Sequence, residues 1–220
     1  MRKPTFIGKL LIFWGCLWAA SAIPMDWSCS RLLQEVVQLE EETWPEGTRA
    51  PQILFENRLA TFPQGFIYVR NDGGKLVGLS TSIRIQLSEP GEIQTWNGAT
   101  SSGTIANHTP DGNVLYIVSV GVSPENQGRG IGKSLVEQQV TLARNLGIKT
   151  VLLGSRVPGF HQYQGDIESY LSQRTDEGRS IDPEIRFYEG SGFSVYEIRP
   201  DYMTDDWQSR NYGVLMKLDL

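Results

Sequence analysis

The 220-residue chain is poor in the residues that build metal centres and disulfide frameworks. It has two cysteines, Cys16 and Cys29, and two histidines, His108 and His161. A zinc site or a disulfide-rich fold needs more of these residues at short, regular spacings, such as Cys-x-x-Cys. The sequence therefore predicts no metal and no disulfide framework.

Basic residues are also in the minority, with 20 Lys and Arg against 25 Asp and Glu and a formal net charge of -5. No basic cluster or stripe follows the N-terminal region, so we expect no nucleic-acid partner. A small cationic amine is compatible with this charge. The length and the 40% hydrophobic content suit one globular domain with a full core.

The main N-terminal apolar run, at 10–20, is too short to span a membrane stably. It follows a basic start and precedes the small residues 20–22, an order typical of a secretory signal peptide. The competing interpretation places a first strand at 18–23, directly before a helix that starts near Asp26. We favour the strand, which leaves 1–15 as an unassigned apolar extension.

The most informative stretch is Gln127–Gly132, with the sequence Gln-Gly-Arg-Gly-Ile-Gly. It follows the β-branched run 114–122 and precedes an amphipathic segment that ends at Gly147. Glycines let consecutive backbone N–H groups approach a phosphate, and a helix start adds positive potential. The order of strand, glycine loop and helix predicts a phosphate-binding loop.

Three phosphate-binding patterns compete for this loop. A Walker loop ends in Gly132-Lys133-Ser134 here, but its required first glycine is replaced by Gln127. The dinucleotide pattern Gly-x-Gly-x-x-Gly has a different glycine spacing, and the acidic residue expected about 20 residues later is missing. The third pattern, [Gln/Arg]-x-x-Gly-x-[Gly/Ala], matches at Gln127, Gly130 and Gly132.

That third pattern resembles the pyrophosphate loop of the Gcn5-related N-acetyltransferases, the GNAT superfamily. A second stretch, Arg186–Phe193, is similar to the family's later motif, a helix carrying Phe-Tyr that ends in Gly-Phe. Asp182 and Pro183 supply the cap and first turn for that helix. The resemblance implies an α/β (α+β) fold, a mixed and largely antiparallel sheet with helices on both faces, in an acyl-CoA N-acyltransferase domain at 16–220.

The resemblance implies acetyl transfer from acetyl-CoA, as co-substrate, directly to a primary amine, without an acyl-enzyme. Because acetyl-CoA is an intracellular cofactor, we expect a cytoplasmic protein; export is the alternative if 1–22 is a signal peptide. We expect a monomer or homodimer. The expected cofactor contacts come from the strand and the glycine loop: Val118, Val120, Val122, Gln127, Gly128, Arg129, Gly130, Ile131, Gly132 and Lys133.

Tyr188 matches the family tyrosine that protonates the departing thiolate, which a phenol can do because the two pKa values lie close together. A core tyrosine on an amphipathic helix is the structural alternative. The base that deprotonates the amine is not identified by the sequence. Glu41, Glu42, Tyr116 and His161 are candidates.

An insertion at 154–181 separates the strand 149–153 from the Phe-Tyr helix and removes the asparagine usual near that strand's end. Arg156 and His161 within it mix basic and proton-transfer groups, which favours an acceptor pocket for a small molecule; a surface loop is the alternative. The expected acceptor contacts are Glu42, Trp44, Tyr116, Arg156 and His161.

Other patterns give further structural expectations. Residues 71–74 predict a hairpin turn, and 88–112 predict a long loop near the site. Gly121 suits a β-bulge, with close packing as the alternative. A non-catalytic acyl-CoA-binding module is the competing function, because a fold does not fix an activity.

Overall fold

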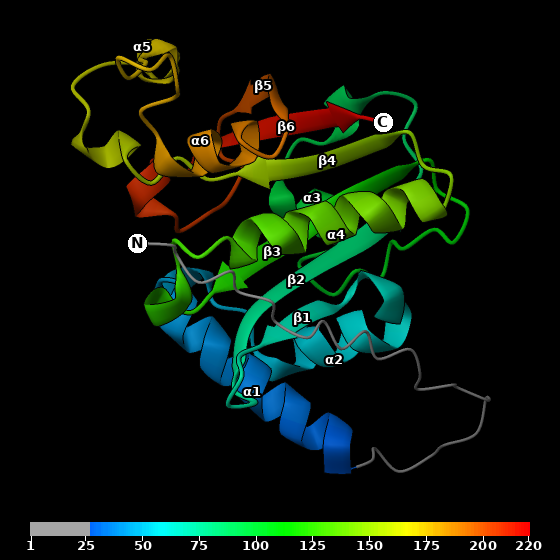
Figure 1. The fold of residues 1–220 in the computed structure, drawn as a ribbon. Helices are drawn as coiled ribbons and strands as arrows, with labels where there is room; N and C mark the ends of the chain where they lie inside the picture. The colour runs from blue at the N-terminus through cyan, green and yellow to red at the C-terminus, as the bar shows by residue number, and fades with distance from the viewer. Residues whose placement is uncertain (1–26) are drawn as a thin grey trace.

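In the computed structural model, residues 27–220 are described and form a mixed sheet with helices on both faces (Figure 1). The strand order is β1-β2-β3-β4-β6-β5, and only the β3–β4 pair is parallel. The largely antiparallel sheet predicted from the sequence is confirmed. The strands are β1 (Ile67–Arg70), β2 (Leu76–Ile85), β3 (Val114–Val122), β4 (Thr150–Ser155), β5 (Ser194–Arg199) and β6 (Gly213–Asp219).

Six α-helices lie within this part of the chain. They are α1 (Trp27–Thr43), α2 (Gln52–Thr61), α3 (Trp96–Thr100), α4 (Ile131–Asn145), α5 (Ile167–Ser172) and α6 (Pro183–Glu189). Figure 1 shows α4 lying across the sheet and α5 projecting from it at the upper left.

The two faces of β2 show how the helices cover the sheet. Leu76 and Leu79 pack in one apolar cluster with residues of α1 and α2, including Val36 and Phe55. Val77 packs instead with the first turns of α4. Burial on both faces explains why β2 reads as a nearly continuous apolar or small-residue run rather than as an alternating one.

Local backbone signals set the ends of α4. Gly130 takes a positive φ of 83° at the N-cap, and Gly147 takes a positive φ of 72° just after the helix. A side chain at either position would be strained, which is why glycine suits both ends. The predicted order of strand, glycine loop and helix is confirmed.

The predicted loop at 88–112 contains more regular structure than its composition indicated. Thr95 caps α3 by accepting a hydrogen bond from the Gly98 amide at 3.0 Å. Trp96 then donates from Nε1 to the carbonyl of Val118 at 3.1 Å, which ties this segment to β3. The sequence of this segment shows no helical periodicity because α3 is too short to repeat an apolar pattern. The helix could therefore not be predicted in this way.

The bulge expected at Gly121 lies elsewhere. Gly121 pairs regularly with Leu79, whereas the β2–β3 register slips at Val118, which has no β2 partner between Ile117 and Ser119. A Cβ on Gly121 would lie 3.3 Å from the hydroxyl of Thr43. Close packing against the end of α1, the alternative interpretation, is therefore the role of this glycine.

Within residues 27–220, no helix has both the length and the apolar character needed to cross a membrane. The same residues contain no group of three or more His, Cys, Asp or Glu side chains arranged to hold a metal ion. The first strand proposed at 18–23, the competing signal peptide and Cys16 lie outside the described residues.

Candidate active site

The sheet opens where the two parallel strands part. Pairing between β3 and β4 ends at Ile117 opposite Leu153. From Val118 to Val122, β3 continues with β2 alone as its partner among the described strands. A cleft with about 40 Å³ of free volume lies at this fork, and its lining comes from β3, β4, α1, α2 and α6.

The glycine loop follows the free part of β3. Residues 127–130 are exposed, and the amides of Gly128, Arg129 and Gly130 have no acceptor among the described residues. The first amides of α4 add to this set because a helix start leaves them without partners inside the helix. A Cβ at Gly128 or Gly130 would meet nothing within 4 Å, so the loop has open space in front of it. This geometry suits an anionic group such as a diphosphate.

Gly132 has a packing role, unlike the other two glycines of the loop. A Cβ there would lie 3.2 Å from the ring of Phe187 on α6. The glycine therefore lets α6 approach the start of α4. The two motifs that the sequence analysis separated by more than 50 residues are in contact.

Helix α6 brings Glu184 and Tyr188 to the cleft from a single face, because residues four apart lie one helical turn apart. Asp182 caps the helix by accepting from the amides of Glu184 and Ile185. Burial raises the pKa of the Glu184 carboxyl to about 7, although the neighbouring Arg156 charge favours ionisation. Burial also raises the pKa of the Tyr188 phenol well above its usual value, and the Glu184 charge raises it further.

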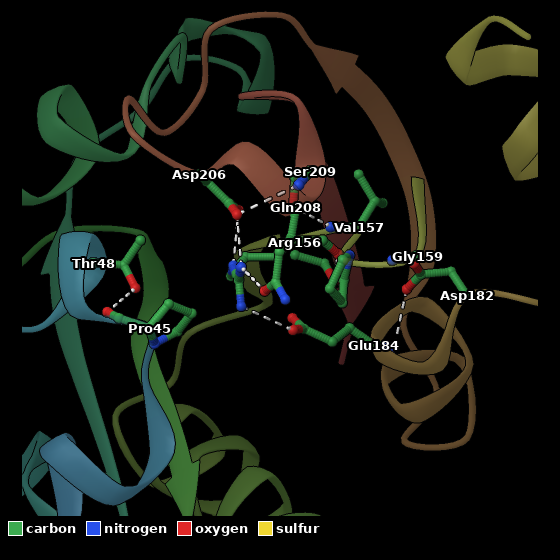
Figure 2. A network of polar contacts seen from close by, with 12 residues as sticks. Pro45, Thr48, Arg156, Val157, Gly159, Asp182, Glu184, Asp206, Gln208 and Ser209 are labelled. Carbon is green, nitrogen blue, oxygen red and sulfur yellow. Dashed lines mark hydrogen bonds and ion pairs between the residues drawn. The ribbon is translucent and has the colours of Figure 1, made fainter. Parts of the chain in front are cut away.

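Arg156 is fixed at the cleft by a dense polar network (Figure 2). Its Nε and Nη2 atoms donate to the two carboxylate oxygens of Asp206 at 2.8 and 2.6 Å, and Nη2 also donates to Gln208 at 3.0 Å. Its Nη1 atom lies 3.7 Å from Glu184. Burial disfavours the charge on Arg156, but Asp206 and Glu184 outweigh it and raise the pKa of Arg156.

Two of the five expected acceptor contacts, Trp44 and Arg156, line the cleft, and so does Tyr188. They also contact one another, because the Arg156 guanidinium lies 5.8 Å from the Trp44 ring centre. The expected cofactor residues Val118 and Val120 border the same space.

The other three expected acceptor residues lie outside the cleft lining. Glu42 is exposed and its carboxylate lies 3.4 Å from the Lys75 ammonium. Tyr116 is buried and hydrogen-bonded to Tyr202, and burial raises its pKa to about 12. His161 bonds from Nδ1 to the carbonyl oxygen of Pro158 at 2.7 Å within the insertion.

Three charged residues of the cleft were not identified from the sequence. Glu40, Arg58 and Glu184 all line it. Burial raises the pKa of the Glu40 carboxyl to about 7 and lowers the pKa of Arg58 to about 10. The sequence contains a signal for two of them. Glu40 and Arg58 occupy the apolar faces of their helices, where a charged residue is unusual.

The mixed sheet, the fork between β3 and β4 and the glycine loop before α4 define a protein of the GNAT fold class. Comparison with protein families matches residues 33–164 to the family described as "Acetyltransferase (GNAT) family". The chain belongs to this family.

Two curated relatives come from Bacillus subtilis (strain 168). One, "Uncharacterized N-acetyltransferase YkwB", is 32% identical over 190 residues, which cover 84% of this chain and 83% of that protein. The other, "Probable hydrolase YhcX", is 30% identical over 187 residues, which cover 84% of this chain but 36% of that longer protein.

Two solved structures share the fold closely. The loading GNATL domain of CurA from Lyngbya majuscula has a TM-score of 0.77 at 25% identity, covering 86% of this chain and 93% of that chain. The GphF GNAT-like decarboxylase in complex with isobutyryl-CoA has a TM-score of 0.73 at 24% identity, covering 85% and 94%. The second likeness shows the fold alone.

Proposed function

We propose that the protein transfers an acetyl group from acetyl-CoA directly to the primary amine of a small molecule. The observation that carries this proposal is the pairing of Glu184 and Tyr188 on one face of α6, beside the free part of β3. Pairs of groups whose surroundings separate their pKa values are typical of acid and base assignments. Use of acetyl-CoA also supports the cytoplasmic location expected from the sequence.

In this mechanism the diphosphate of the cofactor binds the exposed amides of the glycine loop. The pantetheine arm then follows β3 from Val122 towards Val118 and brings the thioester to the cleft. Backbone groups on an unpaired strand edge can bond an extended ligand in this way. The register slip at Val118 comes directly after Ile117, the last residue of β3 that pairs with β4.

The chemical step needs two proton transfers. The amine nitrogen forms a bond to the thioester carbonyl carbon, the carbon–sulfur bond breaks, and the sulfur leaves as a thiolate. Glu184 takes the proton lost by the amine, and Tyr188 donates a proton to the thiolate. The Tyr188 phenol is protonated at neutral pH, so it carries the proton that the leaving group needs. Burial makes this phenol a weaker acid than a free one, and the same low-polarity cleft would raise the pKa of the departing thiolate and so favour the transfer.

The test is CoA release from acetyl-CoA with a panel of small primary amines. Tyr188→Phe should lower kcat by about 100-fold or more and leave the Kd for CoA unchanged, because general acid catalysis contributes about 100- to 10,000-fold. Tyr196→Phe is the matched control, because Tyr196 is an exposed tyrosine on β5. In the wild type, kcat/KM should rise with pH around 7 as Glu184 loses its proton.

Wild-type turnover in Tyr188→Phe would refute the assignment of the acid. CoA binding without turnover of any amine would favour the competing function, a non-catalytic acyl-CoA-binding module. Because one relative is called a probable hydrolase, the reaction is also run without an amine. CoA release under that condition would argue against an amine acceptor.

A further inference from the structure

Arg58 is a buried cation with an unused hydrogen-bond donor. It is 2% exposed and lines the cleft. Its Nε atom donates to the carbonyl of Gly103 at 2.9 Å, and its Nη1 atom lies 3.5 Å from the hydroxyl of Thr81. Its Nη2 atom is buried and has no hydrogen-bond partner among the described residues. A buried polar group without a partner costs stability, so this one requires an explanation.

Neighbouring groups do not neutralise Arg58 directly. The charge of Glu40 attracts it, but the two side chains make no ion pair within 4.0 Å among the described residues. The Glu40 carboxylate instead accepts a hydrogen bond from the Ala50 amide at 2.9 Å. The ring of Phe55 lies 5.0 Å from the guanidinium. Arg156 in the same cleft differs, because Asp206 binds its guanidinium in a bidentate pair. One arginine of the cleft is therefore satisfied by the protein, and the other keeps a free donor.

The position of Arg58 links it to the proposed reaction. The Thr81 hydroxyl that it contacts lies 2.8 Å from the hydroxyl of Ser119 on β3. Ser119 lines the cleft between the two expected cofactor contacts, Val118 and Val120. A group bound by Arg58 would therefore lie close to the strand that holds the thioester in the proposed mechanism.

We propose that Arg58 binds a substrate carboxylate in this cleft, so that the natural substrate pair of this protein includes a carboxylate. The planar guanidinium suits carboxylate oxygens better than any other protein cation does. The inference rests on the proposed function for the place of the thioester. The carboxylate belongs either to the acyl group or to the amine acceptor. In both cases the Arg58 guanidinium would bind it in the same way.

The test compares matched ligands on the wild-type protein. The acyl arm measures the Kd of malonyl-CoA against that of acetyl-CoA, which differ by one carboxylate. The acceptor arm measures KM for small amino acids against their carboxamides with acetyl-CoA. A hydrogen bond to a charged group is worth about 1.5–3 kcal/mol, so one arm should favour the carboxylate by about 10- to 100-fold.

Two variants assign the preference to Arg58. Arg58→Met should abolish the preference and leave the Kd of CoA itself unchanged, whereas Arg58→Lys should retain part of it because the charge remains. Arg144→Met, at an exposed arginine of α4, is the control and should keep the full preference. If Arg58→Met does not fold, the wild-type comparison and the Lys variant still decide the question.

Equal affinities in both arms of the wild-type experiment would overturn the proposal. A carboxylate preference that survives in Arg58→Met would also overturn it, because another residue would then be responsible. Failure of the proposed acetyltransferase function would give a different experimental result, namely that no amine is acetylated. The acyl arm measures binding alone, so a preference for malonyl-CoA can be present when no amine is acetylated.

Discussion

Replacing Glu40 by glutamine should stabilise the protein above pH 7 and leave its stability unchanged near pH 4. Glu40 is 8% exposed, and burial raises the pKa of its carboxyl from 4.5 to about 7. Between these values the folded state binds more protons than the unfolded state, so the wild type is at full stability below pH 4.5 and loses it as the pH rises through 7. The loss above pH 8 approaches about 3 kcal/mol, at about 1.4 kcal/mol for each pH unit between the two values.

Urea unfolding at pH 5, 7 and 8.5 measures this loss directly. Glutamine keeps an oxygen that can accept the Ala50 amide, so the comparison isolates the charge. Glu41→Gln is the matched control, because Glu41 is the next residue of α1 and is exposed. A difference between Glu40→Gln and the wild type that does not change with pH would refute the reasoning. So would an equal gain in the Glu41 variant.

Two further predictions concern the glycine loop and the polar network. Gly130→Glu should remove CoA binding measurable by calorimetry, because it places a negatively charged side chain in the anion site. Gly147→Glu is the control and should keep CoA binding. Both glycines have positive φ and open space around them, but they lie at opposite ends of α4. Retained binding in Gly130→Glu would contradict the loop assignment. Asp206→Ala should lower the free energy of unfolding by about 3–5 kcal/mol, because it removes the bidentate partner of buried Arg156 and leaves only the Glu184 carboxylate, 3.7 Å away, to balance its charge. Glu197→Ala breaks a more exposed pair and should cost at most about 1 kcal/mol; equal losses would contradict this prediction.

The parts of the fold that the sequence predicted are those governed by nearby residues. The cap of α6 depends on Asp182 and the two amides that follow it, and the ends of α4 depend on glycines at positive φ. The hairpin turn at 71–74 closes with a hydrogen bond from the Gly74 amide to the Asn71 carbonyl at 2.9 Å. Such signals act over a few residues and can be read without knowing the rest of the chain.

The charged lining of the cleft could not be read in this way. Glu40 and Arg58 take positions that their helices otherwise fill with core residues, yet the pattern does not reveal what each side chain faces. Glu184 precedes Tyr188 by one turn, but its environment comes from Arg156 on another segment. These three residues become a site only when α1, α2 and α6 meet at the fork in the sheet.

The bulge shows a similar limit. Gly121 and Val118 lie in the same strand, and glycine is the residue that a local rule selects for an irregularity. The contact that requires a glycine at 121 comes from Thr43, almost 80 residues earlier. A local rule identified the unusual residue but could not identify the neighbour that makes it necessary.

The contact between Gly132 and the Phe187 ring sets a fixed spacing within the molecule. It joins the end that would hold the nucleotide to the helix that carries Tyr188, the next residue after that ring. A bulkier residue at 132 would push α6 outwards and shift the phenol relative to a cofactor still anchored by its phosphates. Natural or engineered changes at position 132 would therefore alter turnover, because they move the Tyr188 phenol relative to the thioester. They would leave the affinity for the nucleotide nearly unchanged.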